Sequence, residues 1–98
     1  ARLRQAELEA SASLRAAQSH ARSAAGRVTA AMAGEAAAAE AYRLARLGYE
    51  AGRVPLLELT NARRALAEAR VRALDARLAQ VRAEAEIARL SGRTPFGA

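Results

Sequence analysis

The chain has 98 residues and a formal net charge of +6, and all 16 of its basic residues are arginine. Hydrophobic residues make up 52% of the sequence, much of it alanine, while aromatic residues make up only 3% and cysteine is absent. Such a chain forms one domain at most, and it excludes a thick globular core, disulfides and thiolate metal sites. No apolar run approaches the roughly 20 residues that span a bilayer. Dominance of Ala, Arg, Glu and Leu is typical of long helices or coiled coils.

The excess of arginine has two interpretations. It reflects either a compositional bias or an anionic partner, such as nucleic acid or a membrane surface. The arginines are interleaved with glutamates along the chain rather than clustered, and almost no aromatic side chain is present on which bases would stack. We therefore favour the compositional interpretation and expect no nucleic-acid partner.

The first helix is predicted from about residue 2 to about residue 51, a length of roughly 75 Å at about 1.5 Å per residue. Its apolar residues recur at the heptad spacing of a left-handed coiled coil; they are Ala10, Leu14, Ala17, Ala21, Ala24, Val28 and Ala31. The pattern weakens over residues 36–39 and is expected to resume at Ala41, Leu44 and Leu47. Glycines inside the pattern are interpreted as close helix contacts or sites of local fraying; they are Gly26, Gly34 and Gly48.

Residues 49–62 are the only place where two long helical patterns are interrupted and rejoined. Gly52 is suited to the left-handed conformation that ends a helix, and Pro55 fits the first turn of the next one. Thr60 and Asn61 would start that helix by the usual capping preferences, but leucines precede them at helical spacing. We expect these leucines to close the hairpin and Tyr42 and Tyr49 to cover them; the leucines are Leu56, Leu57 and Leu59.

The second helix is predicted from about residue 56 to residue 90, ended by Gly92 and Pro95. The apolar stripe expected to face the first helix consists of Val71, Leu74, Leu78, Val81, Ala85 and Ala88. A second stripe near the turn has a shifted phase and consists of Leu59, Ala62, Leu66 and Ala69. Two stripes indicate that this helix contacts more than one neighbour. About 15 residues of the longer helix would overhang, and an alanine seam buries little apolar area, so we expect further helices around the hairpin.

Residues with catalytic or metal-binding potential are sparse. His20 has Ser23 and Ala24 at the positions where companion ligands would stand on a helix. The sequence shows no Ser/His/Asp set, no Gly-rich phosphate loop and no carboxylate cluster, and pairs such as Glu40 with Arg43 have the spacing of solvated helix-face pairs. We therefore predict no enzymatic activity, no cofactor and no metal site.

Residues 42–66, which read YRLARLGYEAGRVPLLELTNARRAL, carry a more specific signal. They resemble the second-repeat hairpin of TolC-like outer membrane efflux proteins, through Tyr-Glu-Ala-Gly at 49–52, Leu-Glu-Leu at 57–59 and Asn-Ala-Arg-Arg at 61–64. The resemblance implies a homotrimer in the cell outer membrane whose long helices form a periplasmic tunnel. It also implies a periplasmic adaptor and an inner-membrane pump as partners. The chain would then be a fragment, residues 1–98 being a single periplasmic hairpin.

The resemblance also implies a docking and gating site at the tip, comprising Tyr49, Gly52, Arg53, Val54, Pro55, Leu56, Glu58 and Asn61. By position, Tyr49, Glu58 and Asn61 match tip residues that in relatives form hydrogen bonds or ion pairs around the closed tunnel entrance. Relatives often carry Asp at the position of Asn61, so an ionic gate there loses its charge. Some relatives carry a basic gating residue at the position of Val54, and Arg53 stands one place earlier. The stretch at 87–95 is similar to members that export heavy metals or other cations.

The residues alone leave a second function open. A free-standing antiparallel coiled-coil arm that binds a protein or nucleic-acid partner would have the same helical pattern. An arm for nucleic acid would present an arginine stripe on one face, and its binding would weaken steeply with salt. A tip that docks to an adaptor would bind through residues 52–61 with little salt dependence.

Overall fold

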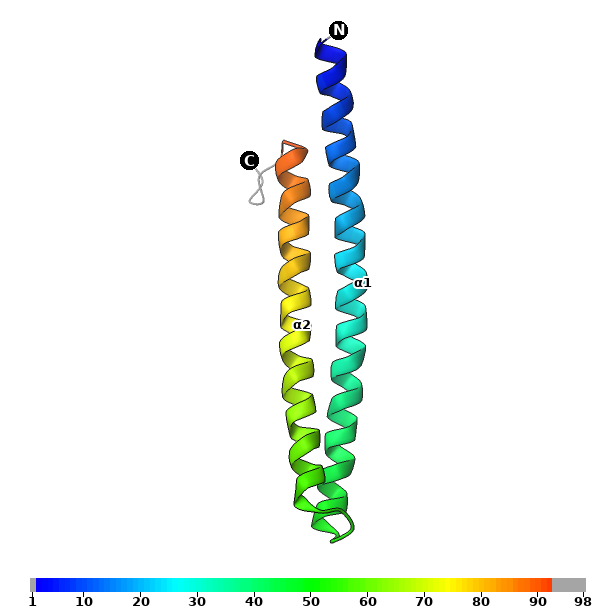
Figure 1. Cartoon of the computed structure of the whole chain (residues 1–98), viewed down its shortest axis with the longest axis vertical. Helices are drawn as coiled ribbons and strands as arrows, with labels where there is room; N and C mark the ends of the chain where they lie inside the picture. Colours follow the sequence, from blue (N-terminus) through cyan, green and yellow to red (C-terminus); the bar gives the residue numbers. More distant parts are fainter. Residues whose placement is uncertain (1, 93–98) are drawn as a thin grey trace.

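The computed structural model describes residues 2–92, which form an antiparallel helical hairpin (Figure 1). Helix α1 spans Arg2–Glu50 and helix α2 spans Leu56–Leu90. The predicted all-α hairpin is confirmed: α2 has the predicted bounds, and α1 ends one residue before the predicted position. The molecule is a thin rod of 76 × 26 × 14 Å.

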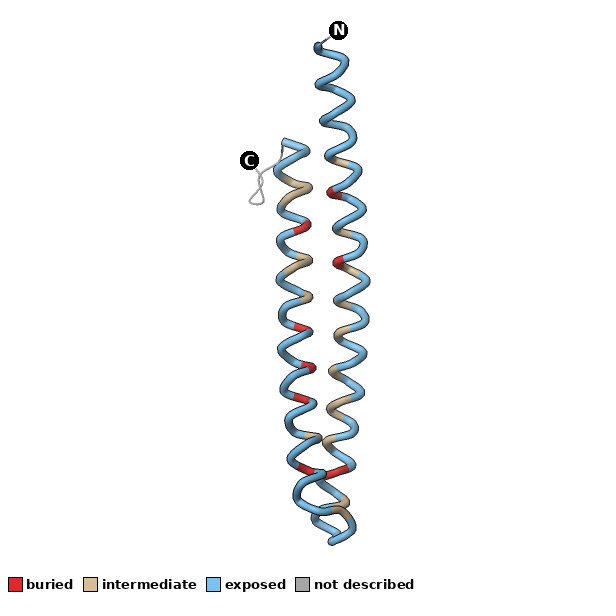
Figure 2. The backbone as a smooth tube through the Cα atoms, viewed as in Figure 1, coloured by how far each residue is buried: buried red, intermediate tan, exposed pale blue. Residues whose placement is uncertain are grey.

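The buried residues form a line along the side of each helix that faces the other (Figure 2). On α1 this seam keeps the alternating steps of three and four without interruption, through Leu14, Ala17, Ala21, Ala24, Val28, Ala31, Glu35, Ala38, Tyr42 and Ala45. The predicted seam is confirmed from Leu14 to Ala31, whereas Ala10 is exposed. The predicted continuation through Ala41, Leu44 and Leu47 is wrong, because all three are exposed and the heptad phase runs instead through Ala38 and Tyr42.

The seam on α2 is formed by the stripe that starts at Leu59, which the sequence predicted to contact a second neighbour. It begins at the predicted positions near the turn and continues to the end of the helix, as Leu59, Ala62, Leu66, Ala69, Ala73, Ala76, Gln80, Ala83 and Ile87. The stripe predicted to face α1 is wrong, because its large members point to solvent, Leu74 with 63% of its surface exposed. Alanine at every second seam position explains why this stripe of α2, and not the one with Leu74, faces α1: small side chains let two helix axes approach closely.

Two polar contacts across the seam align the helices. The Arg70 Nε lies 3.8 Å from a carboxylate oxygen of Glu35, which occupies a seam position of α1. One heptad nearer the turn, the Arg63 guanidinium carbon lies 5.9 Å above the ring centre of half-buried Tyr42, within range of a cation–π interaction. Polar groups at seam positions disfavour shifted pairings, because a shift leaves them unpaired.

Exposed ion pairs within one helix add local support. The Arg43 guanidinium donates to both carboxylate oxygens of Glu40, at 2.6 and 3.0 Å, as the spacing predicted. These hydrogen bonds hold the pKa of Glu40 below its ordinary value. A lowered pKa means that the pair stabilises the folded state when the carboxylate is ionised, and that this contribution is lost as the pH falls through the folded-state pKa. Because both groups are exposed, the effect on stability is small.

Gly26 and Gly34 do not interrupt α1, and the interpretation of them as close helix contacts is wrong. No atom lies within 4 Å of the position that a Cβ would take at either residue. Replacing Gly34 by alanine is therefore expected to stabilise the hairpin by about 0.5–1 kcal/mol, since alanine restricts the unfolded chain and favours helix.

Thermal unfolding followed by circular dichroism measures this change, and Gly48→Ala is the matched control. A Cβ at Gly48 would lie 3.1 Å from Cγ1 of Val54, so the control is not expected to gain the same stability. A loss of stability in Gly34→Ala would contradict a continuous helix at this point.

The two ends of the rod differ. Helix α1 continues past the end of α2 (Figure 1), and Leu14 is its first residue that is not fully exposed, close to the predicted overhang. Helix α2 ends at Leu90 and is capped by Ser91, whose hydroxyl donates to the Ile87 carbonyl at 2.8 Å. Gly92 follows with a φ of 75°, as predicted, while the stop predicted at Pro95 lies outside the described residues.

Neither helix combines the length and the apolar character required of a membrane span within residues 2–92.

Candidate functional site

The tip of the hairpin is built on a Schellman motif, the hydrogen-bonding pattern in which a left-handed residue closes a helix. Gly52 has a φ of 72°, and its N–H donates to the Tyr49 carbonyl at 3.0 Å. The Arg53 N–H donates to the Gly48 carbonyl at 2.7 Å. The predicted role of Gly52 is therefore confirmed, and these bonds satisfy the last carbonyls of α1 while reversing the chain.

Gly48 belongs to the tip as well, although the sequence predicts it only as a residue inside the first helix. Its carbonyl also accepts from the Val54 N–H at 3.3 Å, and half-buried Val54 covers its Cα. Any side chain at Gly48 would push against Val54. The signal that would have revealed this is the spacing, because a glycine four residues before a helix-ending glycine lies beneath the returning chain.

Helix α2 begins at Leu56, directly after Pro55. The extended conformation of Pro55, with φ −75° and ψ 160°, sets the direction of entry. Its carbonyl accepts from the N–H groups of Glu58, at 3.1 Å, and of Leu59, at 3.4 Å. Pro55 thus precedes the first turn rather than lying inside it. The alternative start at Thr60 is excluded, because that residue lies within α2.

The leucines of the tip do not all close the hairpin. Leu59 does, with only 6% of its surface exposed, but Leu56 and Leu57 are 59% and 69% exposed. The expectation that all three close the turn is wrong for these two, because the helix begins at Leu56 and directs its first residues away from α1. Together with exposed Leu44 and Leu47 of α1 they leave apolar side chains from both helices uncovered at this end.

The polar residues of the predicted site lie on the surface of the tip. Glu58 and Asn61, three residues apart on α2, are neighbours on one face and both are exposed. Arg63 does not join them, because it extends over Tyr42. Tyr49 is 42% exposed, and the expectation that it covers the leucines stays a prediction.

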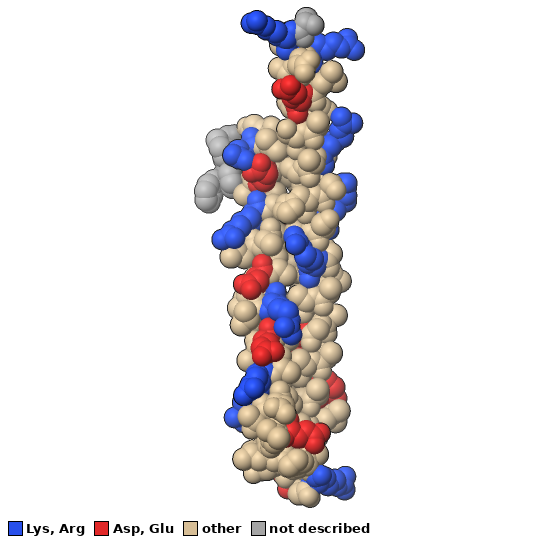
Figure 3. Space-filling model, in the orientation of Figure 1, with Lys and Arg blue, Asp and Glu red and all other residues tan. Residues whose placement is uncertain are grey.

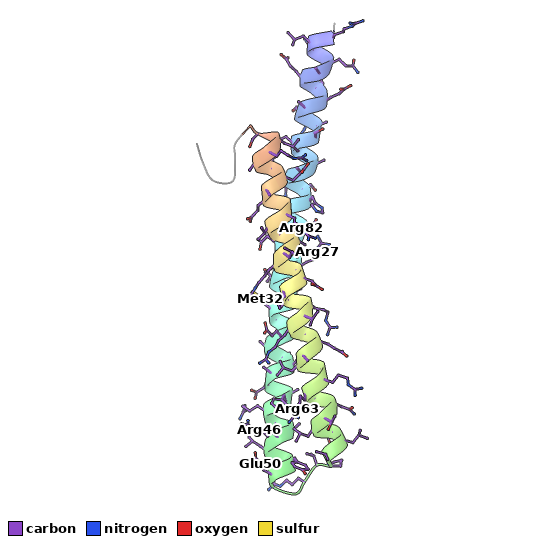
Figure 4. All side chains as sticks on the ribbon, turned by 90° about the vertical axis from the view of Figure 1, so that its left-hand side faces the viewer. Arg27, Met32, Arg46, Glu50, Arg63 and Arg82 are labelled. Atoms are coloured by element: carbon purple, nitrogen blue, oxygen red, sulfur yellow. The ribbon has the colours of Figure 1, made fainter. Side chains whose placement is uncertain are left out.

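The exposed polar groups of the tip are free to bind a partner. Arg53 is exposed in the turn, and Glu50 approaches Arg46 with 3.8 Å between an oxygen and Nε (Figure 4). Within residues 2–92, no side-chain hydrogen bond or ion pair involves Tyr49, Arg53, Glu58 or Asn61. The tip therefore offers donors, acceptors and apolar groups close together, which is the chemistry of a docking surface.

A metal site is not formed by the described part of the chain, where no three His, Cys, Asp or Glu side chains gather. His20 is exposed on α1.

The described residues form a long two-helix rod whose exposed tip carries both apolar and polar side chains. The sequence matches the family of outer membrane efflux proteins over residues 1–93, and the chain belongs to this family. It is therefore a component of an outer membrane efflux channel, and proteins of this family work with an adaptor and an inner-membrane pump. Comparison with curated proteins and with solved structures gave no match.

Proposed function

We propose that the hairpin forms part of the wall of the periplasmic tunnel of a trimeric efflux channel, and that its tip docks to the periplasmic adaptor. The carrying observation is the apolar stripe on the outer side of α2, since its large side chains have no partner within residues 2–92. Its exposed members are Val71, Leu74, Leu78 and Val81. They repeat at heptad spacing, as the seam residues do, so the stripe fits a further helix packed alongside.

The outer edge of α1 supports the same arrangement. It carries small exposed residues at heptad spacing, namely Ser19, Ser23, Gly26, Ala30, Ala33 and Ala37. Small residues accept the larger side chains of a neighbouring helix and let the two axes approach. The outer edge of α2 also has room for the side chains of a neighbouring helix. It carries a shallow hollow of about 330 Å³, lined by Ala67, Glu68, Val71 and Arg72. Two such edges allow hairpins to stand side by side, as the wall of a tunnel requires.

The tip residues take the roles that the resemblance implies. Gly52, Val54 and Pro55 set the shape of the turn, while Leu56 and Leu57 provide apolar contacts for the adaptor. Glu58 and Asn61 line the tunnel entrance from one face of α2. Asn61 contributes a hydrogen bond without charge, and Arg53 is the exposed basic group of the turn.

Photo-crosslinking in the full-length channel tests this function. A benzoylphenylalanine at position 57 is expected to crosslink to the adaptor, and one at position 78 to another helix of the channel. The matched control is position 15, on α1 far from the tip, where no crosslink to the adaptor is expected. If position 57 gives no more crosslink to the adaptor than position 15 does, the docking role is contradicted. A position 78 that remains uncrosslinked would contradict the tunnel wall.

The cargo is proposed to be small molecules or metal ions, on the basis of the similarity of residues 87–95 to cation exporters. Deletion of the full-length gene is then expected to raise sensitivity to metal salts more than to uncharged drugs. Growth in graded concentrations of both measures this, and greater sensitivity to the drugs would contradict a metal cargo.

A further inference from the structure

The exposed stripes on the two outer edges of the rod have a fixed relation to the seam. On α1 the small residues follow successive seam residues by two positions, as Gly26 follows Ala24. On α2 the large residues precede successive seam residues by two positions, as Leu78 precedes Gln80. We call these stripes the small edge, defined as Ser19, Ser23, Gly26, Ala30, Ala33 and Ala37, and the large edge, defined as Val71, Leu74, Leu78 and Val81.

This relation determines the directions in which the two edges point. Two residues turn a helix by about 200°. Because α1 and α2 are antiparallel, two steps forward on α1 and two steps back on α2 turn in the same sense when the rod is viewed from one end. The seam residues of the two helices face each other, so the two edges, rotated by the same angle, point in opposite directions on the outside of the rod.

The same relation gives the two edges the register of the seam. Each step of two residues moves about 3 Å toward the turn on both helices, so residues at equal height in the seam have counterparts at equal height on the edges. Counting from the contacts of Arg70 with Glu35 and of Arg63 with Tyr42, paired edge residues agree in height within about 2 Å. The pairs are Val71 with Ala33, Leu74 with Ala30, Leu78 with Gly26 and Val81 with Ser23.

The two edges are complementary in size. Each large side chain, with between 48% and 63% of its surface exposed, lies at the height of a small residue on the opposite edge. The residue level with Leu78 is Gly26, and no atom lies within 4 Å of the position that its Cβ would take. A copy of the chain placed alongside could therefore seat its small edge on the large edge of the first, as knobs fill holes in a coiled coil.

The next residues toward the turn are complementary in charge. Arg64 precedes Leu66 by two positions and Glu40 follows Ala38 by two, so they continue the large and the small edge at one height. Both are exposed. In the register described, the guanidinium of one copy would meet the carboxylate of the next.

Charges beside the edges do not oppose this arrangement. The net charge of +6 disfavours association of identical chains in general, but basic and acidic side chains alternate along the broad face shown in Figure 3. On the other broad face, Glu84 and Arg22 line one groove within the chain, and they would come close again between copies. Arg63 would approach Arg43 of the next copy, but both guanidinium groups are already engaged within their own chains.

We infer that the large edge binds a second copy of this chain, which docks through its small edge at equal height. The inference rests on the tunnel-wall function and deepens it by naming the neighbour and its register. Because the edges point in opposite directions, a docked copy still presents its own large edge on the far side. Such a heterologous contact adds copies in a row, whereas a two-fold contact closes at the dimer.

Disulfide trapping tests the register, since the sequence contains no cysteine. A chain with Ala85→Cys is mixed with one carrying Ser19→Cys, two exposed positions that extend the edges at equal height. The control mixture pairs Ala85→Cys with Gly26→Cys, in which the second cysteine lies one heptad nearer the turn. We expect about fivefold more mixed dimer from the first mixture, because the control cysteines are about 10 Å further apart. Mass spectrometry distinguishes mixed from identical pairs.

Sedimentation equilibrium tests the large edge itself. Leu74→Ala/Leu78→Ala is expected to weaken self-association by about tenfold or more, because less apolar surface leaves water at the contact. The matched control is Leu3→Ala/Leu8→Ala, which removes the same atoms from exposed leucines of α1, beyond the end of α2. It is expected to change self-association by less than about threefold. All samples contain trimethylamine oxide, which favours the folded chain, and circular dichroism confirms that each remains helical.

Four outcomes would overturn the inference. A helical chain that stays monomeric up to millimolar concentration would exclude a second copy as the partner. Predominance of dimers between two Ala85→Cys chains would mean that large edges pack on each other. Equal trapping in the two mixtures would exclude a fixed register, and equal weakening by the two leucine variants would indicate unspecific apolar association. The tunnel-wall function fails separately, because the crosslink at position 78 in the full-length channel reports any neighbouring helix of the channel.

Discussion

Replacing Leu66 by alanine is expected to lower the free energy of unfolding of the hairpin by about 2–3 kcal/mol. Leu66 is one of the few large side chains in the seam, with 6% of its surface exposed. Its neighbours along the seam are Ala62, Ala69 and Ala73, which are too short to fill the space that the leucine leaves. Urea unfolding followed by circular dichroism measures the change.

Leu74→Ala is the matched control for this experiment. It removes the same atoms from the same helix, but Leu74 belongs to the exposed stripe and its loss is expected to cost less than about 0.5 kcal/mol in the isolated chain. Equal costs for the two variants would contradict the assignment of the seam. If the parent chain proves marginal, the series is repeated in trimethylamine oxide, which raises the stability of all variants.

Replacing Gly52 by valine is the second change with a large expected effect. A β-branched residue with a φ near 72° is strained by about 2 kcal/mol. The turn would have to abandon the hydrogen bonds from Gly52 and Arg53 to the end of α1. We expect the thermal midpoint to fall and the two helices to separate more readily, measured by circular dichroism and by the hydrogen exchange of the Arg53 amide.

Two further variants make this test specific. Gly52→Asn should recover part of the loss, because asparagine tolerates the left-handed conformation better than other residues. Gly34→Val places the same side chain at a glycine that has ordinary helical backbone and no atom within 4 Å of an added Cβ, so it should leave stability nearly unchanged. A Gly52→Val variant that unfolds like the parent would refute the Schellman turn.

The seam of the hairpin buries little apolar area, because most of its residues are alanine. The seam joins the two helices largely through small side chains, while the larger side chains of Leu74 and Leu78 remain exposed. In the proposed channel the hairpin would gain stability from assembly, because burying this stripe removes apolar surface from water at about 25 cal/mol per Å². Variants of the stripe should therefore affect assembly more than folding of the isolated chain.

The sequence by itself determined the two helices, the turn and the residue that makes the turn possible. Helix bounds and the left-handed glycine depend on local preferences, so Gly52 and the start at Leu56 were predictable from a few neighbouring residues. The family was also predictable, because residues 42–66 carry a specific order of tip residues.

Only the tertiary structure decided which stripe of α2 faces α1 and which leucines are covered. Both stripes of α2 have the same heptad period, so spacing could not distinguish Leu66 from Leu74. The choice depends on the rotation that the turn imposes at Leu59 and on the close approach that alanines permit. The contact between Arg70 and Glu35 could not be predicted for a related reason: residues so distant in sequence share a face only once the pairing of the two helices is known.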